Sequence, residues 1–312
     1  MMEKRLTPRQ KNKLKQYLFV ASIMVYPLLL FVVFWLGVNL NSIIMAFEKR
    51  FMDAPTQFAG VENFVSFVSQ VVSNAEILSI GFRNSLTLYL CNLLILTPLS
   101  VFFSYCLYKK CKGHSIIRFT VMLPQLMGGF VVVLVFQRFV EGALPAIFTM
   151  ITGQSSMDFP KLLSNPNYTF GTVTFFNIWI GFCTMLIMIP NAMKEVDSEI
   201  IESAQIDGVD NMIQEMGYIL LPMIYPTLST FLITQFAGIF GNTGALMEFY
   251  RYDAYPETYT IGYWFTVKMA VGSTVYDYPV AAAGGVLLTV LLAPLTFLLR
   301  FILDKVDPGK DE

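Results

Sequence analysis

The sequence predicts an all-α integral membrane protein with six transmembrane helices. Its 312 residues are 55% hydrophobic and only 14% charged, whereas soluble domains average about 25% charged residues. Six runs lack Asp, Glu, Lys, Arg and His over about 20 residues each, the length that a helix needs to cross a bilayer. These runs are Tyr17–Leu40, Leu86–Tyr108, Phe119–Gln137, Thr172–Met193, Tyr218–Phe240 and Pro279–Leu299. The charge deficit and the length of the runs together give the fold class.

Basic residues bound these runs and predict their orientation. A basic segment at residues 1–16 precedes the first run, and the basic loop 109–118 joins the second run to the third. Lys194 follows the fourth run, and Arg300 follows the sixth. These places and the tail hold about two thirds of the 21 Lys and Arg residues, and cytoplasmic loops carry such an excess. We therefore expect both termini and the loop 194–217 to be cytoplasmic.

A seventh apolar stretch, Thr258–Val271, is shorter and carries Lys268. We expect it to form a re-entrant or interfacial helix on the outer face. Neither an internal repeat nor a low-complexity linker divides the chain. The sequence therefore predicts one transmembrane domain over residues 17–303, with a cytoplasmic segment at 1–16 before it and a cytoplasmic tail at 304–312 after it.

A short acidic helix is predicted between the fourth and fifth runs. Asp197 and Ser198 are good N-cap residues, and Glu199 and Glu202 fall in the first turns, where the helix dipole favours acids. Gly208 can adopt the left-handed conformation that ends a helix. Such a short helix is unstable alone in water, so we expect it to dock against a partner through the apolar face Ile200, Ile201 and Ala204. A solvated loop with a charge run is the alternative.

The sequence around this helix resembles the EAA motif of ABC-importer permeases. Glu202-Ser203-Ala204, Asp207-Gly208 and Leu221-Pro222 match the motif, and Val196–Ile201 resembles its usual lead-in. Three departures are visible. Ser203 stands where an Ala is usual, Asp197 replaces a lead-in proline, and the stretch from Gly208 to Pro222 is one residue longer than in the family.

The resemblance implies a type I ABC-importer permease fold with a cytoplasmic coupling helix. In that family the helix sits in a cleft of an ATP-binding subunit and transmits the closure of that subunit to the spans. By this resemblance, the residues that couple the chain to the ATPase are Glu199, Glu202, Ser203, Ala204, Asp207 and Gly208.

Other segments are similar to sugar permeases. They are Phe58–Phe64, Asn84-Ser85-Leu86, Arg118–Pro124 and Tyr276-Asp277-Tyr278. Together they resemble the larger (first) permease subunit of the carbohydrate-uptake, maltose-type family. The resemblance implies a bacterial plasma (inner) membrane protein that imports a sugar or oligosaccharide by alternating access. Its implied partners are a second homologous permease subunit, two ATP-binding subunits, an extracytoplasmic substrate-binding protein and the lipid bilayer.

The resemblance also implies the substrate contacts. The family's Asn-x-Trp-x-Gly segment lines the sugar site, and a second stretch lines it from the fifth run. The matching residues are Asn177, Ile180, Gly181, Thr184, Gln235, Gly238, Ile239 and Asn242. We expect the neighbouring aromatic residues Trp179, Phe182, Phe236 and Phe240 to face the same cavity. Alternatively, Asn177 and Gln235 only bond neighbouring helices, as polar side chains in membranes often do.

Several other functions find less support in the sequence. An ion-coupled carrier usually has ionisable groups inside the bilayer, and the six runs have none. An ABC importer for an amino acid, peptide or anion remains an alternative. No Gly-x4-Gly-Lys-Ser/Thr phosphate loop and no catalytic set are visible, so ATP hydrolysis is assigned to partner subunits and the chain is not expected to be an enzyme. His114 is the single histidine, so we expect neither a metal site nor a cofactor. No basic stripe predicts nucleic acid.

Overall fold

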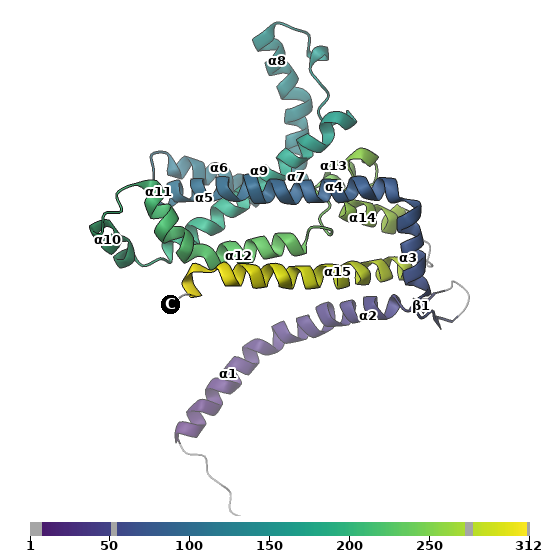
Figure 1. The fold of residues 1–312 in the computed structure, drawn as a ribbon, viewed down its shortest axis with the longest axis horizontal. Helices are drawn as coiled ribbons and strands as arrows, with labels where there is room; N and C mark the ends of the chain where they lie inside the picture. The colour runs from purple at the N-terminus through teal and green to yellow at the C-terminus, as the bar shows by residue number, and fades with distance from the viewer. Residues whose placement is uncertain (1–7, 51–54, 272–276, 311–312) are drawn as a thin grey trace, which may run out of the picture. The chain divides into compact units, whose positions relative to one another are not determined.

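The computed structural model describes residues 8–50, 55–271 and 277–310, and these are almost entirely helical (Figure 1). Part of the predicted segment 1–16, Tyr276 and the last two residues of the tail lie outside the described residues. The chain groups into two compact units. One comprises residues up to 69 together with 274–287, and the other comprises 70–273 together with 288–312.

The first unit holds the N-terminal span and a small strand pair. Its elements are α1 (Pro8–Leu30), a π-helical segment (Phe31–Leu36), α2 (Gly37–Met45), β1 (Glu48–Lys49), β2 (Gln57–Phe58), most of α3 (Glu62–Ser73) and the start of α15 (Asp277–Val306). The strands are antiparallel, with Glu48 opposite Phe58. Buried Asn63 donates hydrogen bonds to the backbone oxygens of Ala46 (2.9 Å) and Glu48 (2.8 Å). This asparagine therefore fixes the start of α3 against the end of α2.

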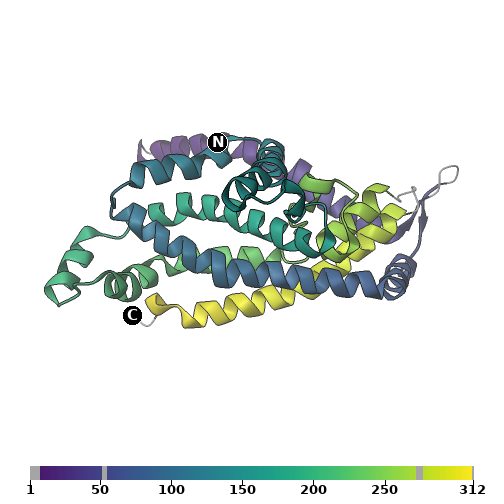
Figure 2. The ribbon, with the colours of Figure 1, turned by 90° about the horizontal axis from the view of Figure 1, so that it is seen from above.

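The second unit holds the remaining helices. They are α4 (Ala75–Cys91), α5 (Thr97–Tyr108), α6 (His114–Leu126), α7 (Gly129–Arg138), α8 (Leu144–Thr152), α9 (Pro166–Lys194), α10 (Ser198–Ile206), α11 (Met212–Gln214), α12 (Leu221–Ala237), α13 (Leu246–Tyr250), α14 (Ile261–Val271) and the rest of α15. Within this unit, α10 and α14 lie at opposite ends of the long helices in both views (Figures 1 and 2).

Six helical stretches of the described residues are long and apolar enough to cross a membrane. They are Lys15–Met45, Ala75–Tyr108, Gly129–Thr152, Pro166–Lys194, Met212–Ala237 and Asp277–Val306. Five of them overlap the predicted runs closely, although the fifth ends at Ala237 because the chain turns at Gly238 rather than continuing to Phe240.

The predicted third run, Phe119–Gln137, is wrong as a continuous helix. Helix α6 ends at Leu126, and Met127 and Gly128 are extended before α7 begins at Gly129. Two consecutive glycines are poor helix formers, which explains the break. The candidate span runs instead from Gly129 to Thr152 and includes Arg138 and Glu141, the charges that had ended the predicted run.

Two apolar clusters organise the second unit. The first packs α5, α9 and α12 around Tyr105, Ile189, Met193 and Leu220. The second packs α7, α9, α13 and α14 around Phe136, Phe176, Leu246 and Tyr263. The two clusters occupy different stretches of α9, and cavities open along the helix between them.

Candidate functional site

Two neighbouring cavities lie in the second unit, against α9 and α12. The larger, of about 610 Å³, is lined by α6, α7, α9, α12 and the segment 242–248. The smaller, of about 490 Å³, lies between α4 and the C-terminal end of α12. Asn92, Gln235 and Asn242 line both cavities. Three side-chain amides are therefore shared by two adjoining spaces.

The structure brings the two predicted substrate-contact stretches together at these cavities. Asn177, Ile180, Gly181 and Thr184 line the larger cavity from α9. Gln235 and Asn242 line both cavities, and Gly238 and Ile239 line the smaller one. All eight predicted residues thus line at least one of the two cavities. Their contact with a substrate stays a prediction.

Asn177 and Asn242 hold the turn that follows α12. The Asn177 Nδ2 donates hydrogen bonds to the backbone oxygens of Val173 and Gly244, both at 2.8 Å. The Asn242 Oδ1 accepts from the Gly244 backbone N–H at 2.8 Å. These bonds give Asn177 the neighbour-bonding role that was the alternative interpretation, while the residue also lines the larger cavity.

Gln235 differs from the two asparagines, because its Oε1 is buried and has no hydrogen-bond partner among the described residues. A buried acceptor without a donor costs about 1–3 kcal/mol. Because Gln235 lines both cavities, a rotation of its side chain that turned this oxygen toward the cavity would let a hydroxyl group supply the donor. Thr184, by contrast, is already engaged, because its Oγ1 accepts from the Gln125 Nε2 at 2.8 Å.

Two glycines allow close packing around the cavities. A Cβ at Gly181 would lie 2.7 Å from the Leu96 Cδ2, where α9 meets the π-helical segment Asn92–Leu96. A Cβ at Gly262 would lie 2.7 Å from the Asn242 backbone oxygen. Gly181 therefore leaves room for the Leu96 side chain, and Gly262 sets the approach of α14 to the turn at Gly241 and Asn242.

The aromatic lining differs from the predicted one. Trp179 stacks on Phe136 inside the second apolar cluster, with ring centroids 6.1 Å apart. The predicted rings Phe182, Phe236 and Phe240 pair with other aromatic rings instead. The aromatic residues that do line the cavities are Phe176, Phe231 and Tyr89. Sequence reasoning missed these residues and the polar residues Asn92, Gln125 and Glu248, whose position depends on helices far apart in the chain.

Helix α10 forms as predicted at both of its ends. The Asp197 Oδ1 accepts a hydrogen bond from the Glu199 backbone N–H at 3.1 Å. Gly208 has a φ of +98°, which is the left-handed conformation that favours glycine. The predicted N-cap and the predicted glycine stop are therefore confirmed.

The predicted apolar face of α10 is divided. Ile201 is only 6% exposed and packs, with Ala204, against the cluster of α5, α9 and α12, whereas Ile200 is 41% exposed. The exposed residues of the predicted coupling set are Glu199, Glu202, Ser203, Asp207 and Gly208. The helix thus rests on its own chain through one side and presents acids on the other.

The connection from α10 to α12 contains a π-helical segment, Glu215–Leu220. A π-helical turn holds one more residue than an α-helical turn, so such a segment is a place where the extra residue expected between Gly208 and Pro222 would fit. Glu215 is buried, and its Oε1 lies 2.6 Å from the Lys109 Nζ. The Tyr105 hydroxyl donates to the Glu215 Oε2 at 3.3 Å. This segment is therefore tied to the end of α5.

Sequence comparisons identify relatives of this chain. It matches the family of binding-protein-dependent transport system inner membrane components over residues 97–312. It is 28% identical over 135 residues to the maltose/maltodextrin transport system permease protein of Vibrio parahaemolyticus, which covers 43% of this chain and 25% of that protein. It is 27% identical over 194 residues to the multiple sugar-binding transport system permease protein of Streptococcus mutans, covering 60% and 64%. The chain thus spans about a quarter of the length of the first curated relatives that it matches.

A solved structure shares the fold. One chain of a bacterial ABC transporter involved in the import of the acidic polysaccharide alginate superposes with a TM-score of 0.73 at 19% identity, covering 96% of this chain and 99% of that one. The predicted six-span permease fold is therefore confirmed. The six apolar helices and the family's inner-membrane description also confirm a multi-pass membrane protein. From the match over residues 97–312, the chain belongs to the family of binding-protein-dependent transport system inner membrane components.

Proposed function

We propose that this chain is the permease subunit of an ATP-driven importer for a sugar or oligosaccharide. The observation that carries the proposal is the amide-lined pair of cavities, in which Gln235 presents a buried oxygen without a donor. Sugars offer many hydroxyl donors and apolar ring faces, which match amides beside Phe176 and Phe231. The relatives' names refer to maltose, maltodextrin and multiple sugars, which supports a carbohydrate cargo.

The charge of the lining favours a neutral sugar. Glu248 borders the larger cavity, and the described residues that line both cavities include no Lys, Arg or His. An acidic sugar would meet this carboxylate without a compensating cation from this chain. We therefore place neutral oligosaccharides ahead of acidic ones, and ahead of the anionic cargo among the non-sugar alternatives.

The orientation that we propose places α10 in the cytoplasm and α14 toward the outer face. The two helices lie at opposite ends of the second unit (Figure 1), and basic residues concentrate near the α10 end, at residues 109–118 and Lys194. Both termini are then cytoplasmic by the charge bias. A substrate-binding protein would dock on the outer side, as the solved alginate importer in complex with its periplasmic protein suggests.

The coupling step that we propose uses α10 as a lever. One ATP-binding subunit binds this chain at the exposed acids Glu199 and Glu202, and a second ATP-binding subunit binds a second homologous permease. Their closure moves α10, and Ile201 passes the movement to the apolar cluster of α5, α9 and α12. Because α9 and α12 also line the cavities, their displacement alternates the access of the cargo between the two sides.

Transport in proteoliposomes tests this function. The chain would be purified with the subunits encoded beside it and supplied with its binding protein and labelled maltodextrin or another neutral oligosaccharide. We expect uptake that requires both ATP and the binding protein. Uptake that follows an ion gradient without ATP would instead make the chain a secondary carrier, and selective uptake of an amino acid or peptide would overturn the sugar assignment.

A further inference from the structure

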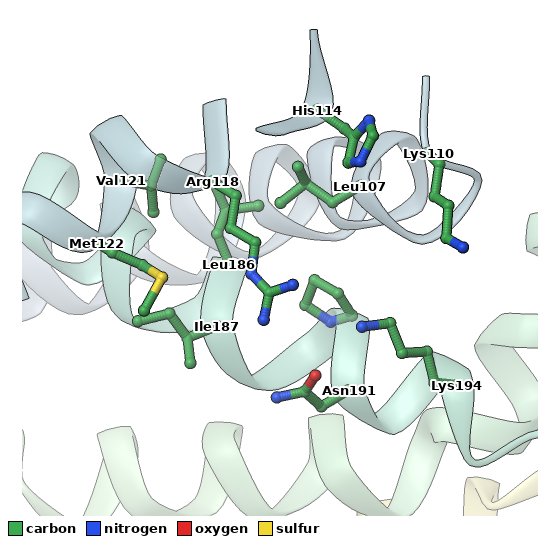
Figure 3. A pocket seen from close by; sticks show the side chains of 11 residues that line it. Leu107, Lys110, His114, Arg118, Val121, Met122, Leu186, Ile187, Asn191 and Lys194 are labelled. Carbon is green, nitrogen blue, oxygen red and sulfur yellow. The ribbon is translucent and has the colours of Figure 1, made fainter. Parts of the chain in front are cut away.

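A separate small cavity lies toward the α10 end of the second unit and shares no lining residue with the two amide cavities. It has a volume of about 110 Å³ and is formed by the end of α5, the first two turns of α6 and the last turns of α9. Its polar lining consists of Lys110, His114, Arg118, Asn191 and Lys194. Figure 3 shows the Arg118 guanidinium and the Lys194 ammonium directed toward the space beside Asn191.

The cations of this cavity form no ion pair with an acidic residue in the part of the chain that the structure describes. Among the described residues, neither an acidic side chain lines the cavity nor does one form a salt bridge with Lys110, Arg118 or Lys194. Like charges that line one partly enclosed space repel one another. An anion bound there would relieve the repulsion, and a planar guanidinium beside an ammonium is a common arrangement for phosphate.

The remaining walls of the cavity are apolar, and they continue onto an exposed surface. Val121 and Met122 of α6 line the cavity together with Leu107 and Ile187. On the helix surface, residues three and four positions from Met122 are its neighbours. These are Phe119 and Leu126, which are 65% and 76% exposed. A cationic pocket therefore opens beside an apolar strip of α6.

Helix α6 packs along α9 and runs from the α10 end toward the larger cavity, which Pro124 and Gln125 line (Figure 1). It is only 13 residues long, which is too short to cross a bilayer, and it is separated from the next span by the break at Met127–Gly128. Basic pockets between helices at the cytoplasmic side of membrane proteins attract anionic headgroups. A phosphate with acyl chains attached fits both parts of the site, whereas an acidic protein segment would leave the apolar strip uncovered.

We propose that this cavity binds the phosphate of an anionic phospholipid, with Arg118 and Lys194 on the headgroup and the acyl chains along Phe119 and Leu126. The site is distinct from the sugar cavities and needs only the proposed orientation of the α10 end. Lys194 ends α9, and α10 begins four residues later at Ser198. A bound lipid would therefore restrict the movement of the segment that connects α9 to the coupling helix.

Native mass spectrometry of the purified importer complex tests the proposal. The complex would be titrated with phosphatidylglycerol and, separately, with zwitterionic phosphatidylcholine. We expect R118Q/K194Q to bind phosphatidylglycerol about 30-fold more weakly than wild type, from about 1 kcal/mol per cation, with no change for phosphatidylcholine. Each single variant should bind phosphatidylglycerol about fivefold more weakly than wild type. The single variants provide the test if the double variant does not fold.

The matched control is K112Q/K305Q, which removes two exposed lysines that do not line the cavity. This variant should bind both lipids as wild type does. Equal phosphatidylglycerol binding by R118Q/K194Q and the control would overturn the proposal. The proposal would also be overturned if inorganic phosphate stabilised wild type in neutral lipid against heat as much as phosphatidylglycerol does. It would likewise be overturned if R118Q/K194Q lost the ATPase subunits while its lipid binding stayed unchanged.

Discussion

The Lys109 Nζ lies 2.6 Å from the Glu215 Oε1, so that the last turn of α5 is bound to the segment that follows the coupling helix. Glu215 is 6% exposed, and the Tyr105 hydroxyl donates to its other oxygen. A buried carboxylate of this kind is stabilised only while its cation and its donor stay in place. Any movement of the segment Glu215–Leu220 relative to α5 must therefore carry this pair along or break it.

Replacing Lys109 with Met should destabilise the chain by about 3 kcal/mol, because it leaves a buried carboxylate without its cation. The double variant K109M/E215L should recover most of that loss, since two apolar side chains replace a buried ion pair with little cost. Thermal unfolding in detergent gives the comparison, with the exposed Lys112→Met as control. Additive losses in the double variant would show that the two residues do not interact.

Replacing Glu202 with Lys should weaken the assembly of the chain with its ATPase subunits and abolish uptake, because it reverses a charge on the exposed side of α10. The stability of the chain itself should change little. Co-purification of the ATPase and ATP-driven uptake measure the two effects. Asp210→Lys, an exposed acid beyond the helix, is the control. Normal uptake by the Glu202 variant would count against a coupling role for α10.

Gln235 and Asn177 should respond differently to truncation. Gln235→Leu removes an acceptor that has no donor in the described structure, so its stability should equal or exceed that of wild type while uptake falls about tenfold or more from loss of a substrate hydrogen bond. Asn177→Ala removes two hydrogen bonds and should lower stability by about 1–2 kcal/mol as well as uptake, with subunit assembly intact.

Uptake rates and unfolding temperatures of the two variants separate these roles. If Gln235→Leu is destabilised as much as Asn177→Ala and transports normally, Gln235 belongs to helix packing. Loss of assembly in Asn177→Ala would make Asn177 a packing residue alone.

Gly262→Ala should be poorly tolerated, because the added Cβ would lie 2.7 Å from backbone atoms of the 241–242 turn, which cannot move aside as a flexible side chain can. The turn carries Asn242, so uptake should fall together with the yield of folded protein. Gly171→Ala in α9 meets nothing within 4 Å and should be neutral or slightly stabilising. Similar yields for the two variants would contradict the close approach of α14.

Tyr250 should give the chain an alkaline instability. Burial raises the pKa of Tyr250 from 10.0 to about 12, and its hydroxyl donates to the Leu163 backbone oxygen at 2.7 Å. The folded chain holds this proton more tightly than the unfolded chain, so the contribution is complete below pH 10 and is lost as the pH rises to about 12. Unfolding temperatures of wild type and Tyr250→Phe should converge over that window. A constant difference from pH 8 to 12 would refute this assignment.

The sequence predicts the features that depend on local patterns. Apolar length defines the spans, and Asp197 and Gly208 define the ends of α10. Asn177 and Gln235 came instead from the resemblance to sugar permeases, and the structure places both on cavity walls. The break at Gly128 escaped prediction because a run judged by its lack of charge shows no interruption where two glycines stand. The direction of Trp179 escaped it because the partner ring, on Phe136, belongs to another helix.

Contacts between distant segments were also beyond the sequence. Asn92 joins the cavity walls from the π-helical segment Asn92–Leu96, and Gln125 joins them from α6. No periodicity within their own helices distinguishes them from residues that face lipid. The pairing of Lys109 with Glu215 likewise joins the end of α5 to a π-helical segment about 100 residues later in the sequence. Only tertiary packing assigns these residues.

The widened turn at Glu215–Leu220 has a consequence for the stretch between α10 and α12. One residue added to a regular α-helix rotates everything after it by about 100°, which would carry Gln235 away from the cavity and toward the bilayer. A π-helical bulge takes up such a residue within one widened helical turn. The side chains of the following helix then keep their orientation. The stretch between α10 and the Leu221-Pro222 pair can therefore be one residue longer without altering which side chains of α12 line the cavities.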